Sequence, residues 1–375
     1  MLDLQAARHH LHQFPELSNA ERLTADWVEQ QLAALVPDQL YNGLGGTGVA
    51  AVFDSGRAGP TVLFRCELDA LPIQEQANHE HPSRHPGIAH LCGHDGHMTI
   101  LLALAEAFTA RRPQTGRAIL LFQPAEETGA GAHQVVADER FSELRPDYAF
   151  ALHNVPGLPL GEVAIKSGPF NCASRGLILE LKGRTSHAAH PEDGLNPAPA
   201  LAQLIQQLQS LPESLPDFSQ ITLVGARLGE RAFGTAAGDA ELMATLRTET
   251  NTAMDALVRR ATTLAEQIAA EAGLELSVAF EDVFDATINS PAGTQAVIAA
   301  CDAQRIPVRE LDHAFRWSED FGALLAASGE GALFALGAGE DHPQLHRPDY
   351  DFPDALVPIG RRIFRDLADR LLDGL

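Results

Sequence analysis

The sequence predicts an α/β fold with a mixed, mostly parallel sheet, interrupted by an α+β domain of ferredoxin-like type. Strand patterns alternate with helical patterns at both ends of the chain, which is typical of a parallel sheet covered by helices. Between residues 172 and 283 the order becomes β-α-β-β-α-β, the split motif of ferredoxin-like domains. A length of 375 residues suffices for two domains of roughly 150 residues each. We therefore expect a discontinuous domain formed by residues 1–171 and 284–375, and an inserted domain formed by residues 172–283.

The discontinuous domain contains six predicted strands and several helices. The segment Ser18-Asn19-Ala20-Glu21 matches a capping box and predicts a helix that ends near Pro37. Apolar runs predict strands over residues 49–54, 61–67, 117–122, 148–152, 162–166 and 332–336. Helices are expected over residues 97–111, 292–303, 319–328 and 354–373.

The inserted domain has its own complete set of elements. Alternating patterns predict strands over residues 175–182, 220–228, 241–249 and 274–280. Helices are expected over residues 196–211 and 252–272.

Composition and charge restrict the class of protein. The chain has 27 basic and 50 acidic residues and a formal charge of −23, with no conspicuous basic patch. We therefore expect neither nucleic acid nor a membrane as a partner. The first residues lack the pattern of a secretory signal, and no run of about 18 apolar residues occurs. The four cysteines are too scattered for a disulfide framework, so a reducing, cytoplasmic location is expected.

One glycine-rich segment resembles a nucleotide-binding motif. The residues from Gly43 to Gly48 match the spacing G-x-G-x-x-G, but a strand pattern follows them instead of a helix. Because that motif needs a helix N-terminus to hold the pyrophosphate, we interpret the segment as a turn that leads into a strand.

The most informative segment is Cys92-Gly93-His94-Asp95-Gly96-His97. An apolar helical run follows it directly, so the six residues lie where a loop enters a buried helix. Cys92 and His94 are spaced to bind one metal ion or two neighbouring ions, and the helix N-terminus is expected to favour the thiolate. On spacing alone, a metal site and a pair of buried residues remain equally plausible. His97 is a further candidate ligand or a residue that orients one.

Other candidate ligands follow predicted strands. Glu126-Glu127 comes after the strand over 117–122, and His153 comes after the strand over 148–152. Side chains at the carboxyl ends of strands in an open α/β sheet converge on one crevice. Glu67 and Asp69 end another strand, where a carboxylate can orient a ligand histidine. His346 is a candidate near the C-terminus, whereas Cys66 and Cys301 are interpreted as packing residues.

These segments together resemble the family of aminoacylases and carboxypeptidases with two co-catalytic metal ions. The branch that they resemble contains hippurate hydrolases and auxin-conjugate (indoleacetyl-amino acid) amidohydrolases. The resemblance covers nearly the whole chain and is carried by residues 12–18, 69–73, 90–97, 123–127, 152–154, 186–189, 318–321 and 346–352. It implies a zinc-peptidase-like catalytic domain, with the inserted domain as lid and dimerisation surface.

The resemblance also implies roles for individual residues. The implied metal ligands are Cys92, which bridges the two ions, together with His94, Glu127, His153 and His346. Glu126 is implied as the general base, Asp69 as the carboxylate that tunes the site, and His187 as the histidine that the inserted domain contributes. The expected cofactors are two divalent metal ions per subunit, Zn or Mn first and Co or Ni next.

The chain departs from the family pattern at three places. Glu67 occupies a position that usually holds Asp, and the effect is expected to be local. Thr185 belongs to a lead-in to His187 that is usually glycine-rich. Thr235 is the nearest polar residue where the inserted domain usually carries Asn. The last two changes fall on expected substrate contacts, so the chemistry is better specified than the substrate.

The expected reaction is hydrolysis of the amide bond of an N-acyl amino acid or a related small amide. Two ions about 3.5–4 Å apart are expected to lower the pKa of a water molecule. Glu126 is expected to take the proton of this water and to pass it to the leaving amine. His187 is expected to stabilise the oxyanion. Arg247 either binds a substrate carboxylate or is a solvated residue at a strand end. The expected assembly is a homodimer or a larger homo-oligomer. A dipeptidase or carboxypeptidase and a non-catalytic metal protein are the alternatives.

Overall fold

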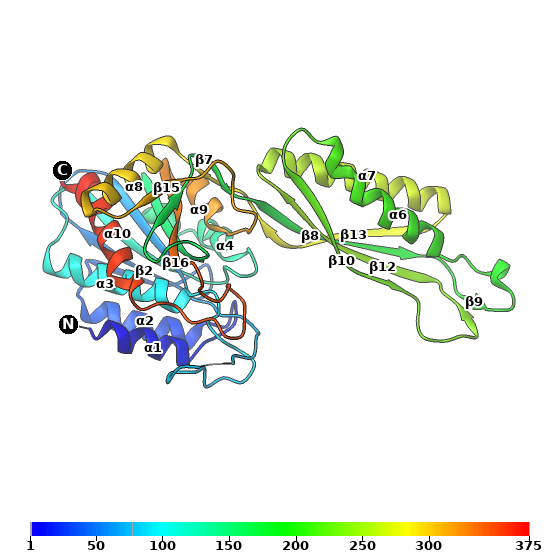
Figure 1. Cartoon of the computed structure of the whole chain (residues 1–375), viewed down its shortest axis with the longest axis horizontal. Helices are drawn as coiled ribbons and strands as arrows, with labels where there is room; N and C mark the ends of the chain where they lie inside the picture. The colour runs from blue at the N-terminus through cyan, green and yellow to red at the C-terminus, as the bar shows by residue number, and fades with distance from the viewer. Residues whose placement is uncertain (1, 77, 375) are drawn as a thin grey trace. The chain divides into compact units, whose positions relative to one another are not determined.

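The computed structural model describes residues 2–76 and 78–374 and divides the chain into two compact units. The first unit comprises Met1–Phe170, Thr287–Ala314 and Glu319–Leu375, and the second comprises Asn171–Ala286 and Phe315–Ser318. Figure 1 shows that segments from both ends of the chain, blue and red, form the first unit, whereas the second unit is one green to yellow stretch.

The first unit is built on an eight-stranded mixed sheet. Its strand order is β1-β2-β4-β3-β5-β16-β6-β15. The strands are β1 (Gln39–Leu44), β2 (Gly48–Asp54), β3 (Thr61–Glu67), β4 (Arg117–Gln123), β5 (Tyr148–Pro156), β6 (Val163–Ile165), β15 (Val308–Glu310) and β16 (Glu330–Gly339). The central block from β4 to β16 is parallel, whereas β1, β2 and β6 form antiparallel pairs. The expected mixed, mostly parallel sheet is therefore confirmed.

Helices bury the central strands. Every residue of β3 is buried, as in a strand that is covered on both faces, although Thr61, Arg65 and Glu67 are polar. The helices of the unit are α1 (Leu4–Gln13), α2 (Arg22–Ala34), α3 (His94–Ala110), α4 (Gly131–Ala137), α5 (Phe141–Leu144), α8 (Pro291–Gln304), α9 (Phe321–Ala327) and α10 (Leu356–Asp373). Helix α3 packs on β3 between α1 and α10, and it is buried along almost its whole length. This packing fixes the N-terminus of α3 at the carboxyl end of the central strands.

The second unit has the expected order β-α-β-β-α-β. Its elements are β8 (Ala173–Lys182), α6 (Ala198–Ser210), β10 (Ser219–Leu228), β12 (Asp239–Thr248), α7 (Asn251–Ala272) and β13 (Glu275–Phe284). The strands form an antiparallel sheet of order β10-β12-β8-β13, and α6 and α7 contribute to its separate apolar core. A two-stranded ribbon of β9 (Ser186–His187) and β11 (Thr235–Ala236) extends from this sheet.

Local sequence signals were wrong or silent at several places. The predicted capping box does not begin a helix: α2 starts at Arg22, the Ser18 hydroxyl donates to Asp69, and the Glu21 carboxylate accepts from the Ala125 N–H. The side chains of Ser18 and Glu21, which the local pattern assigned to a helix cap, therefore bind partners that are distant in sequence. Helix α1 and strand β1 were not predicted, nor were the short strands β7 (Gly168–Asn171) and β14 (Thr287–Asn289). The segment with Gly45 is a hairpin turn between β1 and β2, as the pattern indicated.

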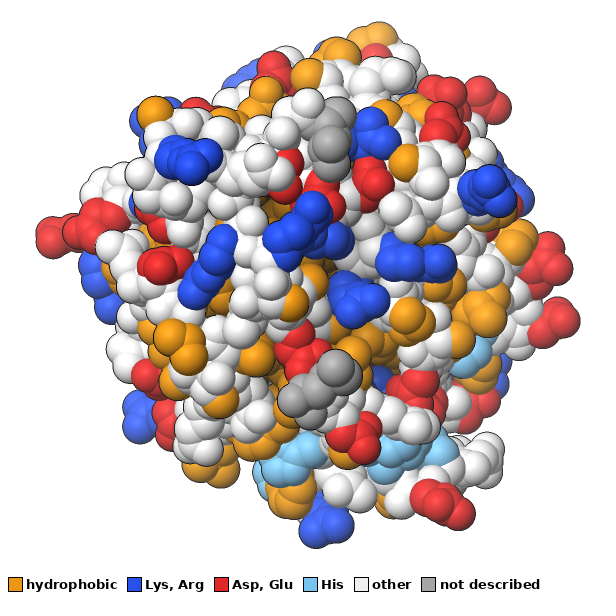
Figure 2. All heavy atoms as spheres, turned by 90° about the vertical axis from the view of Figure 1, so that its left-hand side faces the viewer, with side chains coloured by type: hydrophobic (Ala, Val, Ile, Leu, Met, Phe, Trp, Pro, Cys, Tyr) orange, Lys and Arg blue, Asp and Glu red, His pale blue; other side chains and the backbone are white. Residues whose placement is uncertain are grey.

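The surface of the first unit mixes charged and apolar side chains. Figure 2 shows basic, acidic and hydrophobic side chains interspersed on one face, with several Lys and Arg side chains near its centre. Helices α3 and α10 bring Arg111, Arg361, Arg362 and Arg365 around a hollow of about 370 Å³, where two aspartates oppose them. In the part of the chain that the structure describes, no helix is long and apolar enough to cross a membrane.

Candidate metal centre

Two glycines give the segment Cys92–His97 its shape. Gly93 precedes the first residue of α3 with φ +90°, and a Cβ there would lie 2.3 Å from Oδ1 of Asn154. A Cβ on Gly96 would lie 2.3 Å from the ring of Phe352. Glycine at position 93 allows the chain to turn sharply after Cys92, and glycine at position 96 allows α3 to pack closely against Phe352. The two glycines thereby place Cys92 and His94 on either side of the turn.

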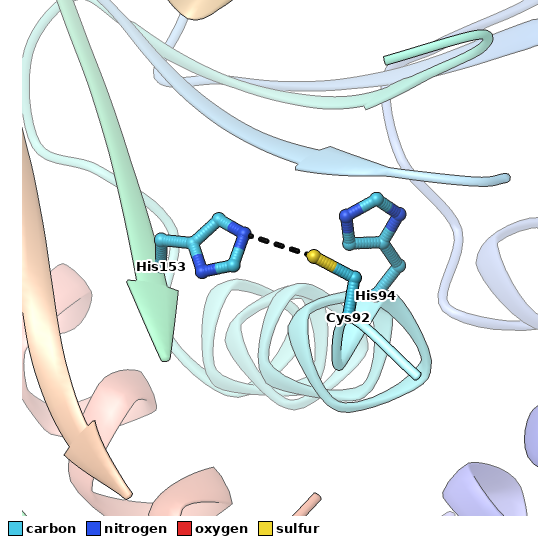
Figure 3. A group of neighbouring side chains, drawn as sticks. All are labelled: Cys92, His94 and His153. Atoms are coloured by element: carbon cyan, nitrogen blue, oxygen red, sulfur yellow. Dashed lines mark hydrogen bonds between the residues drawn. The ribbon is translucent and has the colours of Figure 1, made fainter. Parts of the chain in front are cut away.

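The sulfur of Cys92 lies at the centre of the candidate ligands. Figure 3 shows His153, at the end of β5, directed at Cys92, with His94 on the other side at the start of α3. The Sγ of Cys92 is 3.5 Å from Nε2 of His153, and the donor atoms of Cys92, His94 and His153 all lie within 4.8 Å of one another. The same limit holds for Cys92 with Glu127 and His346, and for His94 with Glu126 and Glu127. Cys92 thus belongs to two overlapping groups, as a bridging ligand must.

The two ligand imidazoles are held in tautomers that suit metal binding. The Nδ1–H of His94 donates to the main-chain oxygen of Asp69 at 2.8 Å, and that of His153 donates to the main-chain oxygen of Asn154 at 2.9 Å. Each Nε2 lone pair is therefore available for a metal. The Nε2 of His94 and Oε1 of Glu127 are buried without a hydrogen-bond partner among the described residues, and they lie 3.9 Å apart. Sulfur, imidazole and carboxylate donors with uncompensated lone pairs fit divalent metal ions.

His346 approaches the centre from the loop that precedes α10. Its Nε2 is 3.8 Å from Oε1 of Glu127, and half of its side chain is exposed. Its backbone has φ +64°, and Ala125, directly before Glu126, has φ +50°. Non-glycine residues adopt this left-handed conformation at an energetic cost, and such residues cluster at functional sites. The strained backbone aims His346 and Glu126 toward the same region.

Asp69 supports the centre through two different groups. Its main-chain oxygen orients His94, whereas its carboxylate accepts hydrogen bonds from the Ser18 hydroxyl at 2.7 Å and the Glu127 N–H at 3.0 Å. Asp69 therefore fixes the histidine and the carboxylate on opposite sides of the site. Sequence reasoning assigned it a tuning role without distinguishing these two functions.

Burial dominates the electrostatics of the acidic ligands. Burial, reinforced by the carboxylates of Glu319 and Glu127, raises the pKa of Glu126 well above its usual range. Burial also raises the pKa of Glu127 to about 7. The pKa of the Cys92 thiol is raised by burial and by the nearby Glu127 and Glu126. Burial and these two carboxylates therefore oppose the ionisation that the helix N-terminus was expected to favour.

A buried arginine organises the floor of the site, and sequence reasoning missed it. Arg65 on β3 contacts Glu67, Glu319 and Asp320, and its Nε donates to Gln123 at 2.8 Å. All of these side chains are buried. A charged arginine within an otherwise apolar strand was the available signal, since a buried charge requires partners. The network joins β3 and β4 to the segment that begins α9.

Glu67 extends this network to a ligand. Its Oε2 accepts from Nδ1–H of His97 at 2.6 Å, and the Nε2 of His97 accepts from the Asn154 N–H at 3.2 Å. His97 is thus fully engaged as an orienting residue, the second of the two roles that its position suggested. His97 thus binds the N–H of Asn154, and the carbonyl of the same residue orients His153.

The remaining candidate residues lie in the second unit. Thr235 and His187 are direct cross-strand partners on the ribbon of β11 and β9, and both are exposed. Arg247 is partly buried, and its Nη1 donates to the Arg316 carbonyl and to the Ser318 hydroxyl, each at 2.9 Å. Arg247 is therefore not a solvated residue at a strand end.

The fold and the centre are those of a metal-dependent hydrolase, and comparison with known proteins gives the family. The model of Peptidase family M20/M25/M40 matches residues 63–370. The chain belongs to this family.

Three similar proteins illustrate its place there. The N-acetyl-L-cysteine deacetylase of Bacillus subtilis is 32% identical over 374 residues, which are 98% of this chain and 87% of the relative. The hippurate hydrolase of Campylobacter jejuni is 30% identical over 99% of this chain and 98% of its own. The crystal structure of a dinuclear metal-binding M20 peptidase from Bacillus subtilis superimposes with a TM-score of 0.84 at 26% identity, covering 99% of this chain and 98% of that one.

Proposed function

We propose that the chain hydrolyses the amide bond of an N-acyl amino acid with the help of two divalent metal ions. The observation that carries this proposal is a set of overlapping donor groups: Cys92 lies with His94 and His153 and also with Glu127 and His346, and the carboxylate of Glu126 lies beside His94 and Glu127. The names of the relatives, a deacetylase of N-acetylcysteine and a hydrolase of hippurate, support the substrate class, since both substrates are N-acyl amino acids.

The proposed ligands divide into two sets that share Cys92. His94 and His153 would hold one ion, and Glu127 and His346 would hold the other. Two bound ions would polarise the amide carbonyl and lower the pKa of a water molecule. The mixed sulfur, nitrogen and oxygen donors favour zinc, while manganese, cobalt and nickel also accept such ligands. Glu127, between His94 and His346, would keep the two ligand sets in contact.

Glu126 is the proposed general base. Its Oε2 lies 3.8 Å from Nε2 of His94, and its side chain is almost fully buried. Because burial raises its pKa, the carboxylate accepts a proton more readily than an exposed glutamate does. Glu126 would take the proton of the attacking water and pass it to the nitrogen of the leaving amine. Asp69 would hold the Glu127 backbone and the His94 ring still during these transfers.

The second unit is proposed to complete the substrate site as a lid. His187 would stabilise the oxyanion, its pairing with Thr235 would place a hydroxyl beside the imidazole, and Arg247 would bind the substrate carboxylate. We also propose that this unit, residues 172–283, forms a homodimer surface. The proposed location is the cytoplasm, because all four cysteines are buried free thiols.

A dipeptidase or a carboxypeptidase that uses the same centre is the second candidate function. The similar Bacillus subtilis structure, which is named as an M20 peptidase, favours it. The test is a hydrolysis panel with metal-reconstituted protein, in which N-acyl amino acids are compared with dipeptides and C-terminally extended peptides. We expect the acyl amino acids to have the highest kcat/KM. Faster cleavage of the peptides would make peptidase activity the favoured function instead.

Glu126→Gln is the matched variant for this test. It preserves size and hydrogen bonding but cannot accept the proton, so we expect kcat to fall by roughly 10²–10⁴-fold with the metal content unchanged. Hydrolysis at the wild-type rate would remove Glu126 from the role of general base.

A further inference from the structure

A second cluster of histidines and carboxylates lies next to the metal centre and takes no part in the proposed hydrolysis. It contains His9, His12, His79 and His81, with Arg8 and the carboxylates of Glu75, Asp95, Asp351 and Asp354. The rings of His9 and His81 stack at 3.7 Å between centroids, and those of His79 and His81 at 4.0 Å. We call this group the histidine cluster.

Hydrogen bonds determine where two positive charges of the cluster lie. The ring nitrogens of His12 face Asp95 at 2.8 Å and Glu75 at 3.0 Å. Because a carboxylate can only accept, both nitrogens donate and His12 is an imidazolium. The Nη2 of Arg8 lies 2.7 Å from Nε2 of His81. A guanidinium nitrogen can only donate, but the same nitrogen of His81 also lies 3.2 Å from Oδ2 of Asp351, which can only accept. Burial and the Arg8 guanidinium lower the pKa of His81 to about 4, so its ring is neutral at neutral pH.

The charges of the histidine cluster do not balance. Its four carboxylates carry four negative charges at neutral pH, and Arg8 with the imidazolium of His12 supplies two positive charges. Two negative charges remain. Arg8, His12 and Asp95 are almost completely buried, whereas the side chains of Asp351 and Asp354 are 28% and 32% exposed. Excess negative charge at the edge of a buried cluster favours a further cation there.

His79 presents unused donor atoms at this place. Both of its ring nitrogens are buried without a hydrogen-bond partner among residues 2–76 and 78–374. Its Nε2 is 2.9 Å from Oε1 of Glu75, a contact that is close but not aligned as a hydrogen bond. Donor atoms of His79, His12 and Asp351 lie within 4.8 Å of one another. Glu75 already accepts hydrogen bonds from His12 and from the Ser83 N–H, and Asp351 accepts one from Arg8. A cation beside His79 would therefore bind to the remaining lone pairs of these two carboxylates.

We propose that Glu75, His79 and Asp351 form an auxiliary site for a divalent cation of the zinc class, separate from the two proposed catalytic ions. One imidazole and two carboxylates suit zinc, with water completing the coordination. The site would tie two loops together, and the Gln76 N–H already donates to the Pro348 carbonyl at 2.7 Å. Because Asp351 follows His346 by five residues, the bound ion would steady the loop that carries a catalytic ligand.

The zinc content per chain tests this proposal. The full chain is stripped with a chelator, reconstituted with zinc, desalted and analysed by elemental mass spectrometry. We expect wild type and the control His313→Ala, which alters an exposed histidine, to bind one more zinc ion per chain than His79→Ala. Equal zinc content in wild type and His79→Ala would overturn the proposal. Protons on the histidines would then balance the negative charge of the histidine cluster.

Cobalt gives a second readout that does not need hydrolysis. The proposed catalytic centre contains a thiolate and should give a sulfur-to-cobalt charge-transfer band, whereas the auxiliary site has only nitrogen and oxygen donors. We expect His79→Ala to keep that band at full intensity. The variant should bind one cobalt ion fewer per chain, and the lost ion should be one that does not contribute to the band. Loss of the band itself in His79→Ala would overturn the proposal, because the variant would then disturb the catalytic centre. Absence of hydrolysis in every protein would contradict the proposed function and leave this test valid.

Discussion

Glu67 and His97 form a buried pair with Oε2 and Nδ1 only 2.6 Å apart. Through the main-chain N–H and carbonyl of Asn154, this pair connects a carboxylate on β3 to the proposed ligand His153 on β5. Glu67 also contacts Arg65 with its other oxygen. The side chain of Glu67 thus reaches both partners from one strand. The expectation that Glu in place of the family's usual Asp has a local effect stays a prediction.

The first prediction concerns this pair. Glu67→Gln removes the charge that Arg65 and His97 share, so the orientation of His153 should loosen. We expect metal affinity to fall roughly 10–100-fold, the usual loss when a residue that orients a ligand is changed. Competition with a chelator measures it, and Glu67→Asp should retain more affinity than Gln because it keeps the charge. An unchanged affinity in Glu67→Gln would show that the pair only supports the fold.

The second prediction concerns the bridging ligand. Cys92→Ser replaces the soft thiolate with a hard hydroxyl that is not ionised at neutral pH. Zinc affinity should fall more than manganese affinity, because manganese prefers oxygen donors. Titration of the chelator-stripped protein with each metal measures the ratio. Cys301→Ser, at a buried cysteine in α8, is the control and should leave the ratio unchanged. Equal losses for both metals would argue against a thiolate ligand.

The third prediction concerns helix packing. Gly96→Ala would place a methyl group 2.3 Å from the Phe352 ring, so α3 or the segment of Phe352 must move. Overpacking of this kind should lower the free energy of unfolding by about 1–3 kcal/mol. Gly234→Ala is the matched control, because a Cβ there meets nothing within 4 Å. Denaturant unfolding compares the two, and similar midpoints would contradict the close packing.

The fourth prediction concerns pH. Burial lowers the pKa of His12, but hydrogen bonds to Asp95 and Glu75 outweigh burial and raise it to about 9, above the ordinary value of 6.5. Folding therefore takes up a proton between these values. The resulting stabilisation, about 3 kcal/mol, is complete below pH 6.5 and is lost as the pH rises through 9.

Denaturant unfolding in chelator measures this effect. Wild type should lose stability between pH 6.5 and 9 relative to His12→Gln, whose curve lacks the contribution. Parallel curves for the two proteins would show that His12 is not protonated in the fold.

The sequence was sufficient to predict the class of fold for physical reasons, and the ligand set stays a prediction whose members lie close together. Strand patterns and the apolar run after Cys92 depend on local periodicity, which a single chain displays. The roles of Asp69 and Arg65 depend on which atoms face each other across strands that are distant in sequence, and no local pattern encodes that geometry. The cap at Ser18 was wrong for the same reason, because Asp69 takes its hydroxyl.

Strand β16 (Glu330–Gly339) lies between β5 and β6 in the sheet, although residues 172–283 are synthesised before it. During synthesis, one edge of β5 therefore stays unpaired until β16 is available. The inserted unit can fold around its own core in the meantime. His346 emerges later still. The proposed ligand set is complete only after His346 has been synthesised, so the binding of both ions would follow the synthesis of the inserted unit.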